Sequence, residues 1–370
     1  MGNFSTKVDR VVDCHVHLRD LDELGQLKRI RIRAGMDRMN VVCIVDPPSG
    51  RGTASGLCAK LAAPGAFYVF GGLNHAESVS AGQASAGALA EQLDAMLAAG
   101  CDGVKLIEGK PTSRQKLPQP LDGDYYSEFF ARAERRRAPM LWHVADPEEF
   151  WDPARTPAWA AKHNWGYGPD DVAKETLYEE VAAVLRRHPG LRVILAHFYF
   201  LSADLPRAEA FLAENPNARI DLAPGVEMLF NLSRDPAAAR EFFIAHQDRI
   251  VFGTDISSSV SIASAMARAE LVRLWLESEE PFAVPAEADE LLEPGGDARI
   301  VPLNLPADVL AKIYAGNFEA VAGDAPAAVD VPQAIELCRR DAAVAAALSG
   351  TDADSTEPGH CAAILLDYPR

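Results

Sequence analysis

The chain has 370 residues, a formal net charge of −17 and 48% hydrophobic residues. The acidic balance argues against nucleic acid or anionic membrane as a partner, because phosphate would be repelled. No uninterrupted apolar run reaches the roughly 18 residues that a membrane span needs. The length would hold two average domains, but α/β barrels commonly run past about 250 residues as one unit, so no split is required.

Strand-like and helix-like segments alternate along most of the chain. Short β-branched or apolar runs predict strands at 9–15, 41–46, 66–73, 103–107, 139–144, 191–196, 218–222 and 249–254. Amphipathic or Ala-rich stretches predict helices at 22–38, 52–62, 84–99, 124–137, 171–188, 204–214 and 235–247, with another at 258–276. Eight strand–helix units predict a closed parallel (β/α)8 TIM barrel. The alternative is a doubly wound open sheet, whose chemistry would gather at one switch point.

Three segments fall outside this alternation. Residues 145–170 are rich in Pro, Trp and Gly and follow the fifth strand, which suits an ordered lid or pocket wall. The acidic segment 278–304 interrupts the eighth unit, and a helix at 306–316 is expected to close the barrel and end at Gly316-Asn317. We therefore expect a barrel over 1–324, with inserts at 145–170 and 278–304, and a partly helical C-terminal extension over 325–370.

The cysteines and the start of the chain indicate a reducing, cytoplasmic location. None of the six cysteines forms a Cys-x-x-Cys pair, and several fall in or beside predicted strands, where a free thiol acts as a small hydrophobe. The first residues lack the charged and apolar regions of a secretory signal. A homo-oligomer is compatible with a barrel of this kind.

Potential metal ligands follow four of the predicted strands. His15 and His17 alternate on the first strand, so both side chains point to one face. His143, His197 and Asp255 come at the ends of the fifth, sixth and eighth strands. In a parallel barrel these ends meet at one mouth, and neutral imidazoles with a carboxylate suit a divalent ion, with Zn expected first and Fe, Mn, Co or Ni also compatible.

Lys105 lies inside the apolar fourth strand, Gly103-Val104-Lys105-Leu106-Ile107. In one interpretation it snorkels or pairs with an acid. In the other, burial and a nearby cation depress its pKa, and the neutral amine takes up CO2 as a carbamate that bridges two ions. The site then holds one ion on His15 and His17 and another on His143 and His197. Without the carbamate the site holds one ion, and Lys105 binds a substrate anion.

These motifs together resemble the amidohydrolase superfamily, in particular its amidohydrolase-related branch. The resemblance covers about residues 8–322, and it is specific because the motifs occur in the right order at strand ends. It is carried by Asp13-Cys14-His15-Val16-His17, Gly103-Val104-Lys105-Leu106, His143, Ala196-His197, Phe252-Gly253-Thr254-Asp255, and the late run from Leu305 to Phe318.

The resemblance implies a barrel with one or two metal ions and attack by water on an amide, ester, lactone or related bond. It implies that His15, His17, His143 and His197 are metal ligands and that Lys105 matches the carbamylated lysine of dinuclear members. Asp255 would touch the metal and take a proton from the attacking water. In a mononuclear site, His197 would instead stand off the metal as an acid, base or electrophile.

Three further residues are predicted to bind the substrate. Arg19 follows His17 by two positions, a pattern similar to dihydroorotase-type members, in which the arginine meets a substrate carboxylate. Asn74 closes the third strand, and Trp142 precedes His143; both are expected to line the pocket.

The leading functional hypothesis is a metal-dependent hydrolase acting on a small, carboxylated molecule. The alternative is a lyase, since the same branch hosts metal-dependent decarboxylases and hydratases that use the same ligands. A non-catalytic scaffold is the third interpretation, and the intact ligand set argues against it. Specificity is expected in the loops after the strands, chiefly 145–170 and 223–234.

Overall fold

A computed structural model of the protein describes residues 7–45, 49–76, 87–225, 227–288, 292 and 299–368. Within these ranges, nine parallel strands form one sheet in the order β8-β7-β6-β5-β4-β3-β2-β1-β9. The strands are β1 (Val12–His17), β2 (Arg38–Val42), β3 (Phe67–Gly72), β4 (Gly103–Gly109), β5 (Pro139–Val144), β6 (Arg192–Leu195), β7 (Ala218–Asp221), β8 (Ile250–Val251) and β9 (Ile256–Ser257).

The eighth strand closes the sheet into a barrel, because β8 and β9 are two parts of one strand. Its first part pairs with β7 and its second part pairs with β1. Between them, the Cys14 amide donates to the Phe252 carbonyl at 3.0 Å and the Asp255 amide donates to the His15 carbonyl at 2.8 Å. The predicted TIM barrel is therefore confirmed, and the open doubly wound sheet is excluded.

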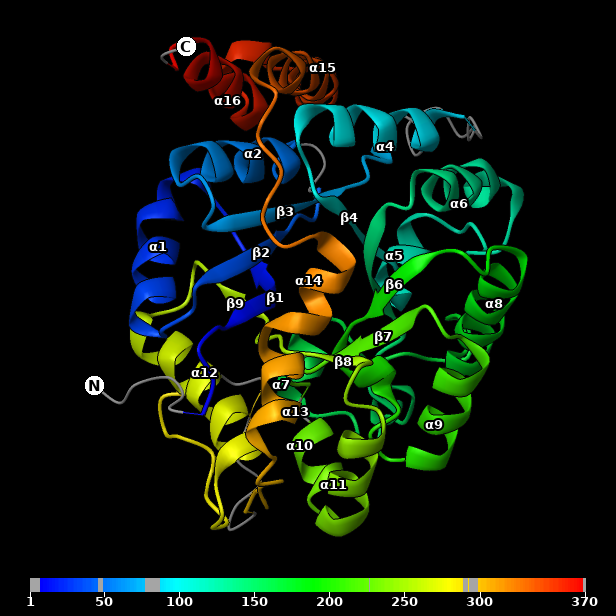
Figure 1. The fold of residues 1–370 in the computed structure, drawn as a ribbon. Coiled ribbons are helices and arrows are strands. Elements are labelled where there is room, and N and C mark those ends of the chain that lie inside the picture. The colour runs from blue at the N-terminus through cyan, green and yellow to red at the C-terminus, as the bar shows by residue number, and fades with distance from the viewer. Residues whose placement is uncertain are drawn as a thin grey trace.

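Helices surround the barrel as the alternation predicted (Figure 1). They are α1 (Leu24–Arg33), α2 (Thr53–Ala62), α4 (Ala88–Ala99), α6 (Asp124–Arg136), α8 (Lys174–Arg187), α9 (Leu205–Glu214), α11 (Pro236–Ala245) and α12 (Ile262–Glu277). The second strand begins three residues before its predicted start at 41, and its predicted end at 46 lies outside the described residues. The predicted helix start at 84 lies outside them too.

Local sequence explains where several helices begin and which face they bury. Asp204 and Asp235 precede α9 and α11, and each side chain accepts from a backbone amide in the first turn, with Pro among the first two residues. In α6, Tyr125, Phe129 and Ala133 recur every four residues and are buried. This spacing turns one stripe of α6 toward the barrel.

The closing helix is longer than predicted. It runs as α13 (Ala307–Ala311), a π-helical turn η5 (Lys312–Gly316) and α14 (Asn317–Ala322), so the predicted end at Gly316-Asn317 is wrong. Gly316 keeps an ordinary helical φ of −56°, which allows the chain to continue as a helix. The side-chain amide of Asn317 donates to the carbonyls of Gln247 and Ile250 at 2.6 and 2.7 Å, which ties the helix to β8.

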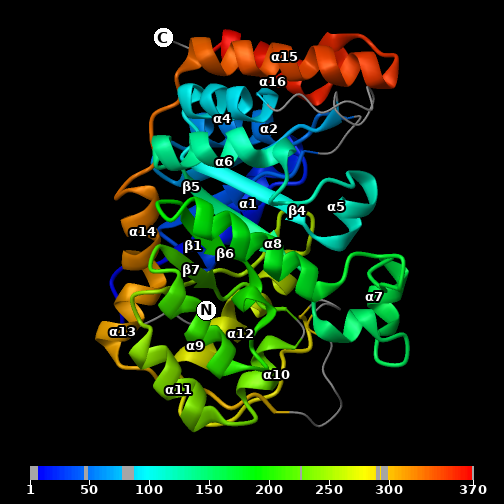
Figure 2. The same cartoon turned by 90° about the vertical axis from the view of Figure 1, so that its right-hand side faces the viewer.

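The two ends of the barrel differ. Figure 2 shows α13 and α14 on one side, and α5 (Pro111–Lys116) and α7 (Ala158–Lys162) projecting on the opposite side, beyond the carboxyl end of β4. Phe318 and Val321 of α14 are buried with the inward residues of the strands, including Phe70 and Leu141. The closing helix thus plugs the amino end of the barrel, and the carboxyl end carries the loops.

The segment after β5 is ordered around an aromatic cluster. It contains the short helices η2 (Glu148–Trp151) and α7, and its buried Phe150, Trp159 and Tyr167 pack together against Trp165. The aromatic rings hold the segment in place over the β5 side of the mouth. The smaller helices η1 (Leu21–Glu23) and α10 (Met228–Leu232) also follow strand ends.

The C-terminal residues form a helical hairpin that packs on the outside of the barrel. It consists of α15 (Val331–Ser349), a turn η6 (Ala353–Ser355) and α16 (Glu357–Leu366), and it lies over α2 and α4 (Figure 1). Gly100, at φ +101°, ends α4, and a Cβ there would lie 2.4 Å from the Ala328 carbonyl oxygen. Only glycine permits both that conformation and the close passage of the connecting chain.

None of the helices within the described ranges combines the length and the apolar character that crossing a membrane requires.

Candidate metal centre and its pocket

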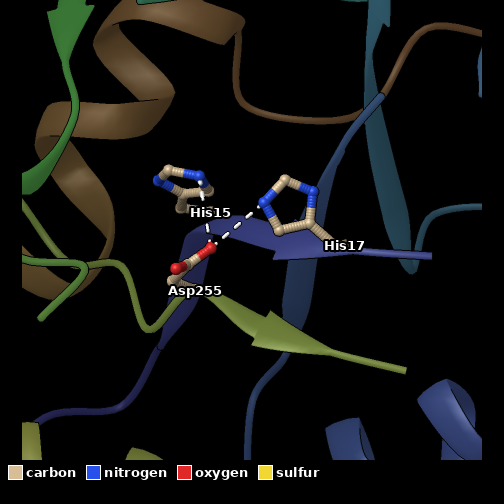
Figure 3. Close-up of side chains that lie close together, drawn as sticks. All are labelled: His15, His17 and Asp255. Atoms are coloured by element: carbon tan, nitrogen blue, oxygen red, sulfur yellow. Dashed lines mark ion pairs between the residues drawn. The ribbon is translucent and has the colours of Figure 1, made fainter. Parts of the chain in front are cut away.

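His15, His17 and Asp255 come together at the carboxyl end of the barrel (Figure 3). One donor atom from each lies within 4.8 Å of the other two. The Oδ1 of Asp255 is 3.0 Å from the His17 Nε2 and 3.6 Å from the His15 Nε2. Two imidazoles and one carboxylate therefore face a common point.

A shift in strand register aims the two histidines at this point. The pairing of β1 with β2 is irregular between Asp13 and Val16. Val12, before the irregularity, and Cys14, within it, are buried in the barrel interior. Such a bulge re-aims the side chains that follow it, so His15 and His17 also face inward, at the mouth.

Each histidine of this group is oriented by an acceptor behind it. The Nδ1 of His17 lies 3.0 Å from the Val42 carbonyl oxygen, and the Nδ1 of His15 lies 2.8 Å from an Asp221 oxygen. Because these oxygens accept, each Nδ1 carries the ring proton. The Nε2 of each neutral ring therefore presents a lone pair to the centre, as metal-binding histidines do.

His197 extends the group on the β6 side. Its Nδ1 lies 3.0 Å from the Ala223 carbonyl oxygen and therefore carries the ring proton. The Nε2 lone pair is then available to bind a metal. Its ring centre is 5.3 Å from that of His15 and 4.9 Å from that of His143. The five predicted ligands thus gather at one mouth, with His143 at the edge of the group.

His143 differs from the other histidines in its hydrogen bonding. Its Nε2, rather than its Nδ1, lies 3.3 Å from Asp146. Asp146 also accepts from Lys110 Nζ at 2.6 and 2.7 Å and from the Tyr167 hydroxyl. The roles of Lys110, Asp146 and Tyr167 in this buried network were not predicted, because none of these three residues stands in a recognisable motif.

The backbone is strained where the sixth and eighth strands deliver their ligands. The turn η3 (His197–Phe200) has φ between 50° and 57° at all four residues, and Asp255 has φ 57°. A left-handed conformation costs an L-residue about 1–2 kcal/mol. Such strain collects at functional sites, where surrounding contacts hold it.

Burial makes the imidazoles neutral. It lowers the pKa of His17, His143 and His197 to about 4 and that of His15 well below its usual value. Burial alone would raise the pKa of Asp255, but the rings of His17, His15 and His197 beside it hold that pKa well below its ordinary value. Neutral rings and an ionised carboxylate are the protonation states in which these groups bind a metal.

Asp221 is the main residue at the site that the sequence did not reveal. It ends β7 fully buried, with one oxygen on His15 and the other accepting from the backbone amides of His197 and Ala223 at 2.7 and 3.1 Å. One carboxylate therefore fixes the positions of two candidate ligands. Asp13 acts similarly on the eighth strand, where it accepts from the Thr254 hydroxyl at 2.5 Å and from the Thr254 amide at 3.1 Å.

Lys105 lies beside the candidate ligands. Its Nζ is 3.2 Å from the His15 Nε2, and only 2% of the residue is exposed. Burial lowers the pKa of Lys105 to about 8, against the opposing influence of Asp221 and Asp255. No carboxylate within the described ranges forms a close ion pair with it.

The three predicted substrate-binding residues lie in different places. Arg19 lines the large cavity at the mouth, and its Nε is 3.4 Å from the Ser257 hydroxyl. Asn74 does not face that cavity: its Oδ1 accepts from the Ala76 amide, and its backbone bonds to Gln92. The neighbouring His75 lines the cavity instead.

Trp142, which was predicted to contact the substrate, does not face the cavity either. It is fully buried in the layer between barrel and helices, with its ring centre 5.2 Å from that of Phe130 in α6. Successive residues of β5 point to opposite faces, so His143 faces the mouth and Trp142 faces outward.

Two cavities adjoin the candidate ligands. The larger, of about 830 Å³, lies over β1 to β4 and is reached by His17, Arg19 and Lys105. The smaller, of about 80 Å³, lies on the β5 and β6 side. It is lined by His143, His197, Asp255, Phe150, Trp159 and Trp165, among others.

The donor set fits a divalent transition metal. The Nε2 lone pair of His17 faces the Asp255 carboxylate at 3.0 Å, and at a pKa of about 4 the ring is neutral at neutral pH. Two electron-rich atoms this close repel each other unless a proton or a metal cation lies between them. Imidazole nitrogen with carboxylate oxygen suits Zn and neighbouring ions of the first transition row.

A family model described as amidohydrolase matches residues 74–321, which begin directly after β3 and end in α14. A search of curated proteins gave no match.

Three solved structures resemble the fold at low sequence identity. A putative amidohydrolase from Staphylococcus aureus is 13% identical, with 85% of this chain and 100% of that chain covered and a TM-score of 0.52. An uncharacterised TIM-barrel protein from Bordetella bronchiseptica is 17% identical, with 85% and 100% covered and a TM-score of 0.49. A 5-carboxyvanillate decarboxylase from Sphingomonas paucimobilis is 13% identical, with 84% and 98% covered and a TM-score of 0.48.

The family match spans most of the barrel, and the fold observed here is the TIM barrel that the resemblance implied. The chain belongs to the amidohydrolase family.

Proposed function

We propose that this protein is a metal-dependent hydrolase that cleaves an amide, ester or lactone bond in a small carboxylated molecule. The observation that carries the proposal is the position of Asp255, an ionised carboxylate that faces two neutral imidazoles, one of which, His17, lines the large cavity beside Arg19 and Lys105. Hydrolysis by metal-activated water needs metal ligands and a base beside the metal, and Asp255 can serve in both roles.

The proposed metal is a divalent ion, with zinc the first expectation, held by His15, His17 and Asp255 together with His197. When bound, it would supply Lewis acidity that brings the pKa of water toward neutrality. Asp255 would accept the proton of the attacking water and pass it to the leaving group. His143, whose ring is held by Asp146 at 3.3 Å, would lie beside the reacting bond.

Lys105 and Arg19 would bind the substrate carboxylate. Both line the cavity, and neither has a carboxylate partner among the close ion pairs of the described residues. The fork of Arg19 suits a planar carboxylate. In the dinuclear form of the site, the neutral Lys105 amine would instead carry a carbamate between two ions.

A decarboxylase is the second candidate, and one observation favours it. Lys105, a cation buried at the cavity floor, lies 3.2 Å from His15 and would bring a substrate carboxylate next to the candidate ligands. Loss of that carboxylate as CO2 requires the same placement. The two reactions differ in the fate of water, which enters the products only in hydrolysis.

The test follows the atoms of water and of the carboxylate. Metal-loaded protein is incubated with carboxylated lactones, esters, amides and aromatic acids in water enriched in oxygen-18. Hydrolysis places one heavy oxygen in the product, whereas decarboxylation releases CO2 and leaves the organic product unlabelled. A protein that carries stoichiometric metal and turns over neither group would contradict both candidates.

The role of Asp255 is tested in the same assay. Asp255→Asn should lower kcat by about 10²–10⁴-fold, since it removes the base. The matched control Asp170→Asn, on the exposed part of the 145–170 segment, should keep full activity.

A further inference from the structure

The large cavity extends well beyond the candidate metal ligands. Its volume of about 830 Å³ lies in the upper part of the range for ligand pockets. The floor is formed by His17 and Lys105, and the far wall includes Lys116 of α5 and Leu348 of α15. A molecule with a single carboxylate at the ligands would leave the outer part of this space unused.

Leu348 comes from the C-terminal hairpin, outside residues 74–321 that match the family model. It is 39% exposed, and of the large exposed apolar side chains among the described residues it alone lines the cavity. Figure 2 shows α15 running over α2 and α4 toward the side on which α5 projects. An exposed leucine at a cavity wall offers an apolar surface on which the apolar part of a ligand can pack.

The hairpin holds Leu348 in a fixed position. Glu357, at the start of α16, accepts from the Ser55 hydroxyl and forms an ion pair with Arg51 Nε at 2.8 Å. A Cβ on Gly50 would lie 3.0 Å from both Ala345 and Pro358, so the loop after β2 fits tightly against both helices of the hairpin. These contacts hold the hairpin, and with it the far wall of the cavity, in place on the barrel.

The charged groups of the cavity favour an anion at each end. Arg19 and Lys105 lie at the metal end, and Lys116 lies at the end of α5; within the described ranges none of the three forms a close ion pair. The other two cations of the lining, Arg51 and Lys110, are paired with Glu357 and Asp146. Glu108, the cavity's acidic residue, is already bonded to His75 at 2.7 Å. In a chain of net charge −17, such a gathering of unpaired cations indicates anion binding.

We propose that α5 and the C-terminal hairpin form an outer subsite for the far end of an elongated dianionic substrate. One anionic group lies beside Arg19 and Lys105, an apolar chain packs on Leu348 and Leu117, and a second anionic group lies beside Lys116. The inference deepens the proposed function and rests on it for the first anionic group. It makes the hairpin a determinant of substrate length.

The test uses linear dicarboxylates from succinate to sebacate and monocarboxylates of the same lengths, titrated into the metal-loaded full chain by calorimetry. Affinity should pass through a maximum at one intermediate length. At that length the dicarboxylate should bind about tenfold or more tightly than its monocarboxylate, the worth of one charged hydrogen bond. Affinity that is flat in length, equal for both series, or undetectable would overturn the proposal.

Two variants assign the effect to the outer subsite. Lys116→Gln should abolish the preference for the dicarboxylate, and Leu348→Asp should weaken the long acids about tenfold while leaving succinate unchanged. The controls are Lys162→Gln on α7 and Leu366→Asp on α16; both residues are exposed, and neither lines the cavity. Variants and controls that behave alike would overturn it.

The result is separable from the reaction itself. Hydrolysis of short substrates with a flat binding series would leave the proposed function standing and remove the outer subsite. A length optimum that depends on Lys116, in a protein that turns over none of the tested substrates, would do the reverse.

Discussion

The two sides of the barrel mouth adjoin the same candidate ligands, but they differ in the volume of their cavities and in the pairing of their cations. Over β1 to β4 lies a cavity of about 830 Å³, in which Arg19, Lys105 and Lys116 lack close carboxylate partners in the described structure, whereas Arg51 and Lys110 are ion-paired. Over β5 and β6 the space is about 80 Å³ and is packed with aromatic rings. Lys110, which lies between the two cavities and lines both, is paired on this side with Asp146 at 2.6 Å.

This difference suggests a division of labour. On the wide side, polar groups left without partners are available to a ligand, because an unsatisfied charge gains most from one. On the narrow side, the network of Lys110, Asp146 and Tyr167 satisfies itself and holds His143. The wide side therefore binds substrate in our proposal, and the narrow side supports the ligands.

The largest expected effect is on Lys105. Lys105→Ala should lower kcat/KM about 10²–10³-fold, as expected for loss of one preorganised charged donor. Metal analysis gives the reason: half the metal is lost if Lys105 bridges two ions as a carbamate, and short carboxylates then restore it in part. Unchanged metal content assigns Lys105 to the substrate.

The matched change on the narrow side is Lys110→Met. It leaves Asp146 buried without its cation, so thermal stability should fall while kcat/KM changes less than for Lys105→Ala. Equal losses of activity in the two variants would contradict the division between the sides.

The next effect concerns Asp221, which supports the floor from beneath. Asp221→Asn should weaken metal binding about 10–100-fold, because an amide cannot hold the Nδ1 proton of His15 as a carboxylate does. Competition with a chelator measures the change. Asp248→Asn, whose carboxylate is 2.8 Å from Lys312 on the surface, should bind metal as the native protein does.

Asp221 also shows what the sequence could and could not predict. Ligands at strand ends were predictable, since a buried strand that ends in a polar residue delivers it to the barrel mouth. Asp221 ends its strand in the same way, yet its role is set by His15 and the His197 amide, which are distant in the chain. Contacts of this kind depend on the barrel's closure and leave no local pattern.

Two errors have the same origin in local geometry. After the third strand, the side chain of Asn74 accepts a hydrogen bond from the Ala76 amide and so does not face the cavity. Trp142 lies on the outer face of its strand. The left-handed turn from His197 to Phe200 could not be anticipated, because L-residues disfavour it and only tertiary contacts hold it. That Leu348 lines the cavity could not be predicted, because it is distant in sequence from His17 of β1, which lines the same cavity.

A smaller effect is expected from Arg19 on the wide side. Arg19→Ala should raise KM about tenfold for carboxylated substrates, the worth of a charged hydrogen bond at a solvent-exposed site. For a neutral ester of the same substrate KM should not change. Steady-state kinetics with the acid and its ester separates loss of the carboxylate contact from a general disturbance of the mouth.

The smallest expected effect concerns Glu227, a buried polar residue that lacks the hydrogen-bond partners found in the network around Asp146. Glu227 precedes α10, and both its carboxyl oxygens are buried with no hydrogen-bond partner in the described structure. Burial, and then repulsion from Glu149, raise the pKa of Glu227 from 4.5 to about 8. The folded protein therefore keeps a proton on Glu227 that the unfolded chain loses above its ordinary pKa.

The sign of the pH dependence follows from that proton. Stability from this group is fully present below the unfolded pKa of 4.5 and is lost as pH rises through about 8. Glu227→Gln carries no charge at any pH, so its melting temperature should exceed that of the native protein by a few degrees near pH 9 and match it near pH 4. Glu209→Gln, an exposed carboxylate on α9, should leave the profile unchanged. Parallel melting curves for Glu227→Gln and the native protein across this range would mean that Glu227 is ionised in the fold and has a cationic partner, which would make the narrow side self-satisfied throughout.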